Sequence, residues 1–364
     1  MHKTAAWPLV LLYGVLIVYA SLFPFANWRE IGADPWHFLL RPLPKYWSGF
    51  DVAINVAGYV PFGGLLALAV LRSGRRTGAV VLALLAGFCL SLVMESIQNY
   101  LPGRVSSKED LILNTMGSML GALLVRALDA MGVIGVWSRV RTRWFVEPAR
   151  GGIVLLALWP AALLFPAAVP FGLGQVVQRF LVALQDMVDD SLLESWLPVV
   201  GTELQPLTPF ATLACVMLGV LIPSLLGFCV VRSRMHRAAF LTMTFAVGVA
   251  VTGLSSALSW GPEHAWAWLD EPTRRGLAAA ALIALALVFA SWRVSAVLAV
   301  LALGVYLSIL NQAPVNPYFA QTLQTWEQGR FVRFHGVSQW LGWLWPYATL
   351  GYVMARIWQR DTKN

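Results

Sequence analysis

Residues 208–231 read TPFATLACVMLGVLIPSLLGFCVV, without one charged side chain. A bilayer core about 30 Å thick is crossed by about twenty apolar residues of α-helix, so this stretch predicts a membrane span. The rest of the chain agrees, because 58% of its 364 residues are hydrophobic and only 12% are charged. A soluble domain has about 25% charged residues. So few charges cannot cover a surface in water, which excludes a soluble globular protein.

Comparable apolar runs recur along the chain and predict about ten spans. The stretch Gly276–Leu310 is long enough for two crossings, and Ser291-Trp292-Arg293 supplies the polar turn between them. Signal cleavage after Val18-Tyr19-Ala20 is a weaker alternative, because the first run continues unbroken to Phe25. We therefore expect an all-α fold, a polytopic transmembrane helical bundle. The runs are Trp7–Phe25, Val52–Leu71, Ala79–Ile97, Leu111–Leu128, Ile153–Phe171, Thr208–Val231, Ala238–Leu258, Gly276–Trp292, Val294–Leu310 and Val337–Trp358.

The basic residues indicate the orientation. With the N-terminus inside, the cytoplasmic segments hold 16 of the 26 Lys and Arg residues and 3 of the 18 Asp and Glu residues. The positive-inside rule then predicts cytoplasmic N- and C-termini, in a multi-pass protein of a bacterial inner membrane. The net charge of +8 follows from this topology and from contact with anionic membrane lipids, so it does not imply nucleic acid. We expect no cofactor and no metal site, and the sequence gives no indication of oligomeric state.

Polar residues inside membrane spans are costly and are candidates for function. At the start of the second span, Asp51, Asn55 and Gly58 share one helical face. Pro61 follows, where it frees a backbone carbonyl one turn earlier and is expected to kink the helix. The alternative is structural, with Asp51 as an N-cap and the proline as a packing kink.

The end of the third span and the start of the fourth are also polar. Glu95 and Gln98 face the same way; the alternative is that Glu95 reaches into the headgroups. Ser106-x-x-Glu109 predicts a capping box for the fourth span. Asp110 and Asn114 share a face with Gly117-x-x-x-Gly121, a pattern typical of close helix packing.

The predicted topology places these residues at the same side of the membrane. The second span starts outside, the third ends outside and the fourth starts outside. Asp51, Glu95, Gln98, Arg104 and Asp110 therefore lie at the outer ends of three consecutive helices. Independent helix caps would not need to share a leaflet, so the spacing predicts a polar pocket open to the outer face.

This arrangement resembles the VanZ-like family. The resemblance covers about residues 7–130, and the rest of the chain lies outside it. The family's namesake is a small membrane protein that lowers sensitivity to the glycopeptide teicoplanin, and the resemblance implies no established biochemical activity. The matching residues are Asp51, Asn55, Gly58, Pro61, Phe62, Gly63, Glu95, Gln98, Arg104, Asp110, Asn114, Gly117 and Gly121.

The domain organisation follows from the spans and the resemblance. We expect a VanZ-like four-helix domain at 1–135, a basic cytoplasmic linker at 136–150 and a C-terminal transmembrane domain of about six helices at 151–364. The long outward loops of the last domain are predicted at 172–207, 259–275 and 311–336. Residues 175–196 of the first of these loops have the pattern of an interfacial amphipathic helix.

Three functions fit the polar residues. The first is recognition of an envelope component (a lipid, a lipid-linked precursor or a glycopeptide-type ligand) by Asp51, Asn55, Glu95, Gln98, Arg104, Asp110 and Asn114. The second is a membrane enzyme acting on a lipid or glycan, with Glu95 and Asp110 as an acid/base pair. The third is purely structural, with polar pairs that lock the helices together. Gly58, Pro61, Gly63, Gly117 and Gly121 are assigned to packing and kinking. A surplus of carboxylates over nearby basic residues favours recognition over locking.

Overall fold

The structure is a computed structural model of the whole chain. The part of the chain that it describes consists of residues 6–22, 25, 28–29, 34–40, 42–43, 49–75, 77–101, 105–147, 149–177, 180–181, 184, 205–314 and 332–361. Within these residues, the side chains of 50–51, 332–337 and 359–361, at helix ends, are not described.

The regular elements in these residues are helices, as the composition predicts. Apart from the helices there is one isolated antiparallel bridge, between Phe145 and Val231. The chain divides into two compact units, residues 1–140 and residues 141–364. The division falls inside one helix, α5 (Val133–Trp144), within the stretch predicted as a basic linker.

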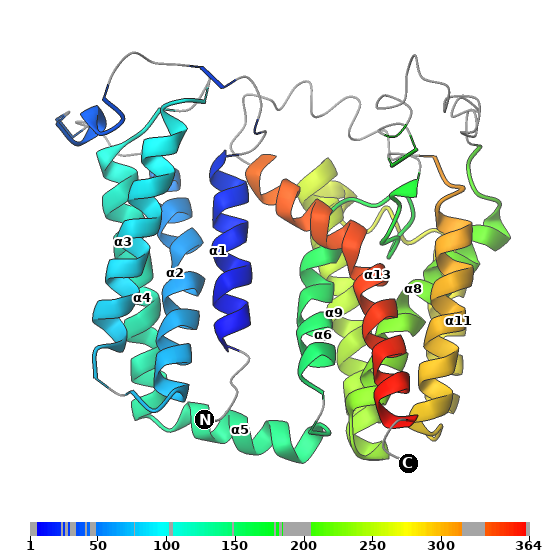
Figure 1. The fold of residues 1–364 in the computed structure, drawn as a ribbon. Helices are drawn as coiled ribbons and strands as arrows, with labels where there is room; N and C mark the ends of the chain where they lie inside the picture. Colours follow the sequence, from blue (N-terminus) through cyan, green and yellow to red (C-terminus); the bar gives the residue numbers. More distant parts are fainter. Residues whose placement is uncertain are drawn as a thin grey trace. The chain divides into compact units, whose positions relative to one another are not determined.

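The first unit contains a bundle of the four helices α1 to α4 (Figure 1). Its central helix, α2, packs against the other three, most extensively against α4. A short 3-10 helix, η1 (His37–Leu40), lies between α1 and α2. Beyond α4 the chain turns steeply into α5, which has no buried residue and is joined to α2 by a hydrogen bond from Arg72 to Ser138. The four bundle helices are α1 (Ala6–Leu22), α2 (Gly49–Arg72), α3 (Ala79–Gln98) and α4 (Lys108–Ala130).

The second unit is built around α8 (Pro209–Val230). Every residue of α8 from Leu218 to Val230 is buried, because α6, α9, α10 and α11 all pack against it. A helix so apolar on all sides is typical of the centre of a membrane bundle. The helices around it are α6 (Arg150–Leu163), α9 (Arg234–Trp260), α10 (Glu271–Leu287), α11 (Trp292–Leu310) and α13 (Val332–Asp361), with the 3-10 helix η3 (Pro262–His264) after α9.

The fifth apolar run does not remain helical to its end. Helix α6 stops at Leu163, and the segment 164–174 forms bends and turns instead of continuing to Phe171 as expected. Pro166 and Pro170 explain the difference, because each removes a backbone donor and disfavours the helical conformation of the residue before it. Most of this irregular segment is nevertheless buried in the second unit.

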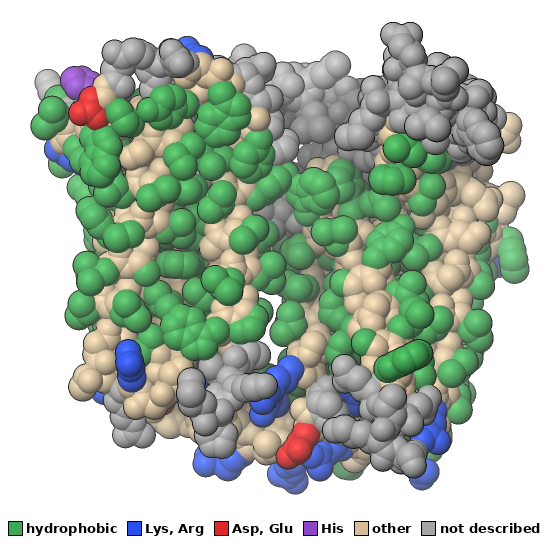
Figure 2. Space-filling view, in the orientation of Figure 1, with side chains coloured by type: hydrophobic (Ala, Val, Ile, Leu, Met, Phe, Trp, Pro, Cys, Tyr) green, Lys and Arg blue, Asp and Glu red, His purple; other side chains and the backbone are tan. Residues whose placement is uncertain are grey.

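Six helices are long and apolar enough to cross a membrane: α2, α3, α4, α8, α9 and α11. Each of the other four predicted runs also overlaps a helix, although a total of about ten spans and the cytoplasmic termini remain predictions. The outward faces of the helices carry large apolar side chains such as Val81, Leu85 and Leu301. In Figure 2 apolar side chains cover much of the visible surface of each unit.

Two predicted outward segments lie largely outside the described residues. Of the amphipathic helix expected at 175–196, only residues 175–177, 180–181 and 184 are described. Of the loop expected at 311–336, residues 315–331 are not described.

Candidate functional site

Glycines bring α2 and α4 into backbone contact and so set the geometry of the site. A Cβ atom added to Gly121 would lie 1.9 Å from the carbonyl oxygen of Val60, and one added to Gly117 would lie 2.3 Å from that of Val56. A Cβ on Gly63 would lie 1.9 Å from the carbonyl oxygen of Ser118. No side chain fits at these positions. Small residues here therefore let the helices approach as the Gly-x-x-x-Gly pattern indicates.

Gly58 has a different environment from the other glycines. Nothing lies within 4 Å of a Cβ built on it, and its carbonyl oxygen accepts a hydrogen bond of 3.0 Å from the Tyr13 hydroxyl. Gly58 thus joins α1 to α2 through its backbone. Pro61 lies inside α2, which continues from Gly49 to Arg72.

The polar cluster consists of Asn55, Tyr59, Ser91, Glu95, Asp110 and Asn114. Its outer layer, nearest the start of α4, includes a bond that joins α2 to α4. The side-chain amide of Asn55 donates a hydrogen bond of 2.7 Å to the Asp110 carboxylate, and both side chains are partly buried. Asp110 is in the first turn of α4, where the helix dipole stabilises a negative charge. The pairing brings together two residues that the spacing had assigned to one site.

Glu95 joins the end of α3 to the start of α4. Its side chain is 3% exposed, and its carboxylate accepts a hydrogen bond of 2.9 Å from the backbone N–H of Ser107. Its backbone carbonyl accepts from the Ser106 hydroxyl at 2.5 Å. The carboxylate therefore points toward the protein at the positive end of α4, and the snorkelling alternative does not describe it.

These bonds change the predicted N-cap. The cap of α4 is Ser107, whose hydroxyl accepts hydrogen bonds from the backbone N–H groups of Glu109 and Asp110. The expected capping box at Ser106 is therefore wrong, because Ser106 donates to Glu95 instead. Both serines can cap a helix, and a residue on another helix decides which one does.

The inner layer lies one helical turn deeper, about 5 Å further along the helices. Asn114 is 7% exposed and its side-chain N–H donates to the hydroxyl of Ser91, at 3.0 Å. The Tyr59 hydroxyl also hydrogen-bonds Ser91 and lies near Glu95. The other polar atom of Asn114, Oδ1, is buried and has no hydrogen-bond partner among the described residues.

The unmatched Asn114 oxygen is the most informative feature of the cluster. Buried polar groups in proteins are nearly always hydrogen-bonded, and each exception calls for an explanation. Exchanging the oxygen and nitrogen of the amide would leave the nitrogen unmatched in its place. Either way, the amide has hydrogen-bonding capacity that the surrounding helices do not use.

Gln98, Asn99 and Lys108 are bonded to the end of α1 and to the segment that connects α1 to α2. The Gln98 amide donates to the carbonyl of Ser21 at 2.9 Å, and the Asn99 amide donates to the carbonyl of Pro35 at 2.8 Å. The ammonium group of Lys108 donates to the carbonyl of Leu39 at 3.2 Å. Gln98 therefore fixes the end of α1 and is not directed at Asn114 or Asp110.

Two of the predicted site residues cannot be placed in the cluster. Arg104 lies outside the described residues, and the side chain of Asp51 is not described. The backbone of Asp51 is within the first turn of α2, so it is not the N-cap of that helix. Among the described side chains, no group of three or more His, Cys, Asp and Glu residues could hold a metal ion.

The site contains residues that the sequence analysis did not single out. Ser91 and Tyr59 complete the inner layer, yet each stands within an apolar run. Their spacing was the available signal: Ser91 is one turn from Glu95, and Tyr59 is one turn from Asn55. A serine or tyrosine inside an apolar run can be identified as a site residue only when it shares a helical face with a charged or amide residue.

A multi-pass helical membrane protein with a polar cluster at one end of an N-terminal four-helix unit is the class that this fold and this site define. Residues 9–129 match the VanZ/LLP1 family. The N-terminal unit is therefore a VanZ-like domain, as the resemblance of the motifs predicted. No curated protein and no solved structure matches the chain.

Proposed function

We propose that the VanZ-like domain recognises an envelope component at the outer ends of α2, α3 and α4. The observation that carries the proposal is the buried Asn114 amide, whose oxygen has no partner among the described residues. Proteins tolerate such a group at places where a ligand supplies the missing bond. The charge asymmetry of the chain supports the placement of these helix ends at the outer face, which we take to be that of a bacterial inner membrane.

The chemistry of the cluster selects the ligand class. Glu95, Asp110 and the Asn114 oxygen are hydrogen-bond acceptors, so they favour a ligand that presents N–H, O–H or ammonium groups. Peptide-bearing lipid-linked precursors, amine-bearing lipid head groups and glycopeptides all present such groups. A link to glycopeptide resistance would follow if the domain bound the drug or its target.

A binding screen tests this proposal. The full chain in lipid nanodiscs would be heated with divalent cations, lipid head groups, undecaprenyl-linked precursors or glycopeptides, beside the variants Glu95→Gln and Asp110→Asn. A ligand that binds only the folded state raises the unfolding temperature. We expect one class to stabilise the wild type and to stabilise neither variant.

Asp110→Asn is the sharper of the two variants. It keeps an oxygen that can accept the bond from Asn55, so the helix contact survives while the charge is lost. We therefore expect its ligand-free unfolding temperature to stay close to that of the wild type. If no compound shifts the wild type and both variants unfold early, the recognition proposal is wrong.

Structural locking is the second candidate, and the Asn55–Asp110 bond favours it. Polar bonds between membrane helices contribute about 0.6 kcal/mol on average. Locking accounts for Asn55, Glu95 and Ser106, each of which is bonded to another element. It does not account for the unmatched atom of Asn114.

A further inference from the structure

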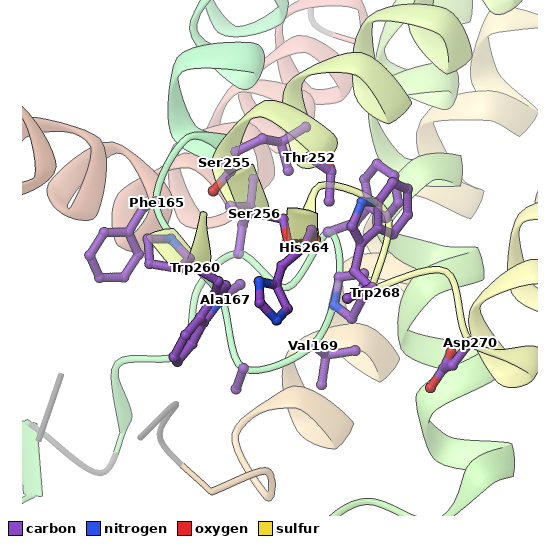
Figure 3. A pocket seen from close by; sticks show the side chains of 17 residues that line it. Phe165, Ala167, Val169, Thr252, Ser255, Ser256, Trp260, His264, Trp268 and Asp270 are labelled. Carbon is purple, nitrogen blue, oxygen red and sulfur yellow. Dashed lines mark hydrogen bonds between the residues drawn. The ribbon is translucent and has the colours of Figure 1, made fainter. Parts of the chain in front are cut away.

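A cavity in the second unit, separate from the polar cluster of the VanZ-like domain, has the properties of a ligand site. Its volume is about 450 Å³, within the range of small-molecule pockets. One wall is the irregular segment that follows α6, from Leu163 to Leu173. The other walls are the end of α9 and the connection between η3 and α10 (Figure 3).

The irregular wall is held in a fixed conformation. Phe171 has a positive φ of 62°, which non-glycine residues rarely adopt. The Tyr306 hydroxyl, on α11, donates to the carbonyl of Phe171 at 2.6 Å and accepts from the N–H of Leu173. The Phe171 ring stacks on Trp159 and meets Trp268 edge-on. A wall supported on several sides suits a preformed binding site.

Glycines on two helices make room for this wall. A Cβ on Gly219 of α8 would lie 2.8 Å from the carbonyl oxygen of Phe171, and one on Gly248 of α9 would lie 2.8 Å from the ring of Trp159. The segment is therefore packed close against α8 and α9. The cavity is a consequence of the early end of α6, because a continued helix would occupy a different path.

A row of hydroxyl groups lines the α9 side of the cavity. Thr252, Ser255 and Ser256 share one helical face. Ser255 donates its proton to the carbonyl of Leu164 at 2.9 Å, and Ser256 donates to that of His264 at 2.7 Å. Each serine oxygen can therefore only accept a bond from a ligand. The Thr252 hydroxyl is buried and has no partner among the described residues.

The charged groups exclude several ligand classes. Among the described residues that line the cavity there is no Lys or Arg, and the carboxylate there is that of Asp270, which caps α10. A phosphate or carboxylate ligand would lack a cationic partner, which argues against phospholipid head groups. A quaternary ammonium group has no N–H or O–H to offer the hydroxyl row. A ligand that is uncharged and rich in O–H groups satisfies both constraints.

The aromatic residues complete the assignment. In Figure 3 the His264 imidazole lies between Trp260 and Trp268 and points into the cavity. The Trp260 side chain remains 44% exposed, so part of its surface is available to a ligand. A sugar ring has an apolar face that packs on an aromatic ring and hydroxyls that bond to serine and threonine. We propose that this cavity binds an uncharged saccharide, either free or as the head group of a glycolipid.

The experiment uses the full chain in phospholipid nanodiscs prepared without glycoside detergents. Binding would be followed by tryptophan fluorescence and by calorimetry, with the disaccharide of N-acetylglucosamine and with maltose as soluble probes. Nanodiscs that contain a monoglycosyl diacylglycerol test the lipid-bound source. Choline chloride and inorganic phosphate represent the excluded classes.

Two matched pairs of variants locate the site. Thr252→Val removes the unmatched hydroxyl with little change of shape, and Thr242→Val is its control on the same helix, with a bonded and exposed hydroxyl. Trp260→Ala removes the aromatic surface, and Trp358→Ala is its control at an exposed tryptophan outside the cavity. We expect Thr252→Val and Trp260→Ala each to weaken saccharide binding about five- to tenfold, and the controls to leave it unchanged.

The outcomes separate the alternatives. Binding of the soluble probes assigns a free saccharide, and binding of the glycolipid alone assigns a membrane source. The proposal is overturned if no saccharide binds, if choline or phosphate binds in its place, or if Thr252→Val and Trp260→Ala bind saccharide as the wild type does. A negative result here leaves recognition by the VanZ-like domain unaffected, since the two sites lie in different units.

Discussion

The tetrapeptide Val-Pro-Phe-Gly occurs once in each unit and adopts two different structures. At Val60–Gly63 it is part of α2, and its glycine contacts the backbone of α4. At Val169–Gly172 it forms a turn in which Phe171 has a positive φ. The four residues are identical, so the difference must come from their neighbours. In the first unit the close contact with α4 requires this stretch of α2 to be a regular helix. In the second unit the Tyr306 hydroxyl is hydrogen-bonded to the turn and holds it in its irregular conformation.

The comparison extends to the sites that each copy supports. Close packing of α2 on α4 places polar side chains between helices and leaves little space. The irregular turn after α6 produces a cavity instead. A helix-to-helix contact and a helix end thus yield two kinds of site in one chain.

Gly63→Ala should have the largest effect, because the added methyl group would lie 1.9 Å from the Ser118 carbonyl oxygen. Neither backbone can move without separating α2 from α4. We expect a loss of about 3 kcal/mol in the free energy of unfolding, at the upper end for overpacked sites. Thermal unfolding of the purified chain measures it.

Gly58→Ala is the control for this prediction, since the space around Gly58 is open. It should leave stability unchanged or raise it slightly, because alanine favours the helix. Equal losses for the two variants would show that general helix properties, and not the contact with Ser118, are responsible.

Tyr306→Phe should have the next largest effect and should act only on the second copy. Two buried backbone groups, the carbonyl of Phe171 and the N–H of Leu173, would lose the Tyr306 hydroxyl and keep only their bond to each other, at 3.1 Å. The expected cost is about 2 kcal/mol in the free energy of unfolding. Tyr347→Phe removes partly buried bonds to Gly174 and Asn311 and should cost less, because Asn311 keeps other partners.

The prolines of the two copies should respond with opposite signs. Pro61→Ala restores a backbone donor inside α2 and should be neutral or stabilising. Pro170→Ala makes the unfolded chain more flexible while the turn gains nothing, so it should cost about 0.5–1 kcal/mol. Stabilisation by both changes would mean that the turn does not depend on its proline, and calorimetric unfolding of the two variants decides it.

These contrasts show what the sequence could predict. Apolarity located the helices, and every predicted run overlaps one. Apolarity could not locate the end of α6, because a proline such as Pro166 can stop a helix without lowering the hydrophobicity of the run, whereas Pro61 and Pro160 lie inside helices. It also could not identify α5 as a helix, since its arginines were interpreted as a linker.

The polar cluster was predictable in part for a similar reason. Charged and amide residues at helical spacing marked Asn55, Glu95, Asp110 and Asn114. The choice of Ser107 over Ser106 as cap depends on Glu95, which belongs to another helix. The cavity of the second unit forms because the segment after α6 lies beside the segment after α9. No local sequence pattern predicts this contact between two distant segments.

The most direct test of recognition by the VanZ-like domain compares Asn114→Leu with Asn55→Leu. The unfolding temperature of each would be measured without ligand and with the compound that stabilises the wild type. Asn55→Leu takes a partner from Asp110 and should unfold earlier. Asn114→Leu removes an unmatched oxygen but also the 3.0 Å bond to Ser91, which keeps its bond to Tyr59. It should therefore unfold close to the wild-type temperature and lose the ligand-induced shift. An Asn114→Leu variant that unfolds well below the wild type, together with a wild type that responds to no compound, would contradict recognition and leave locking of the bundle as the role of the cluster.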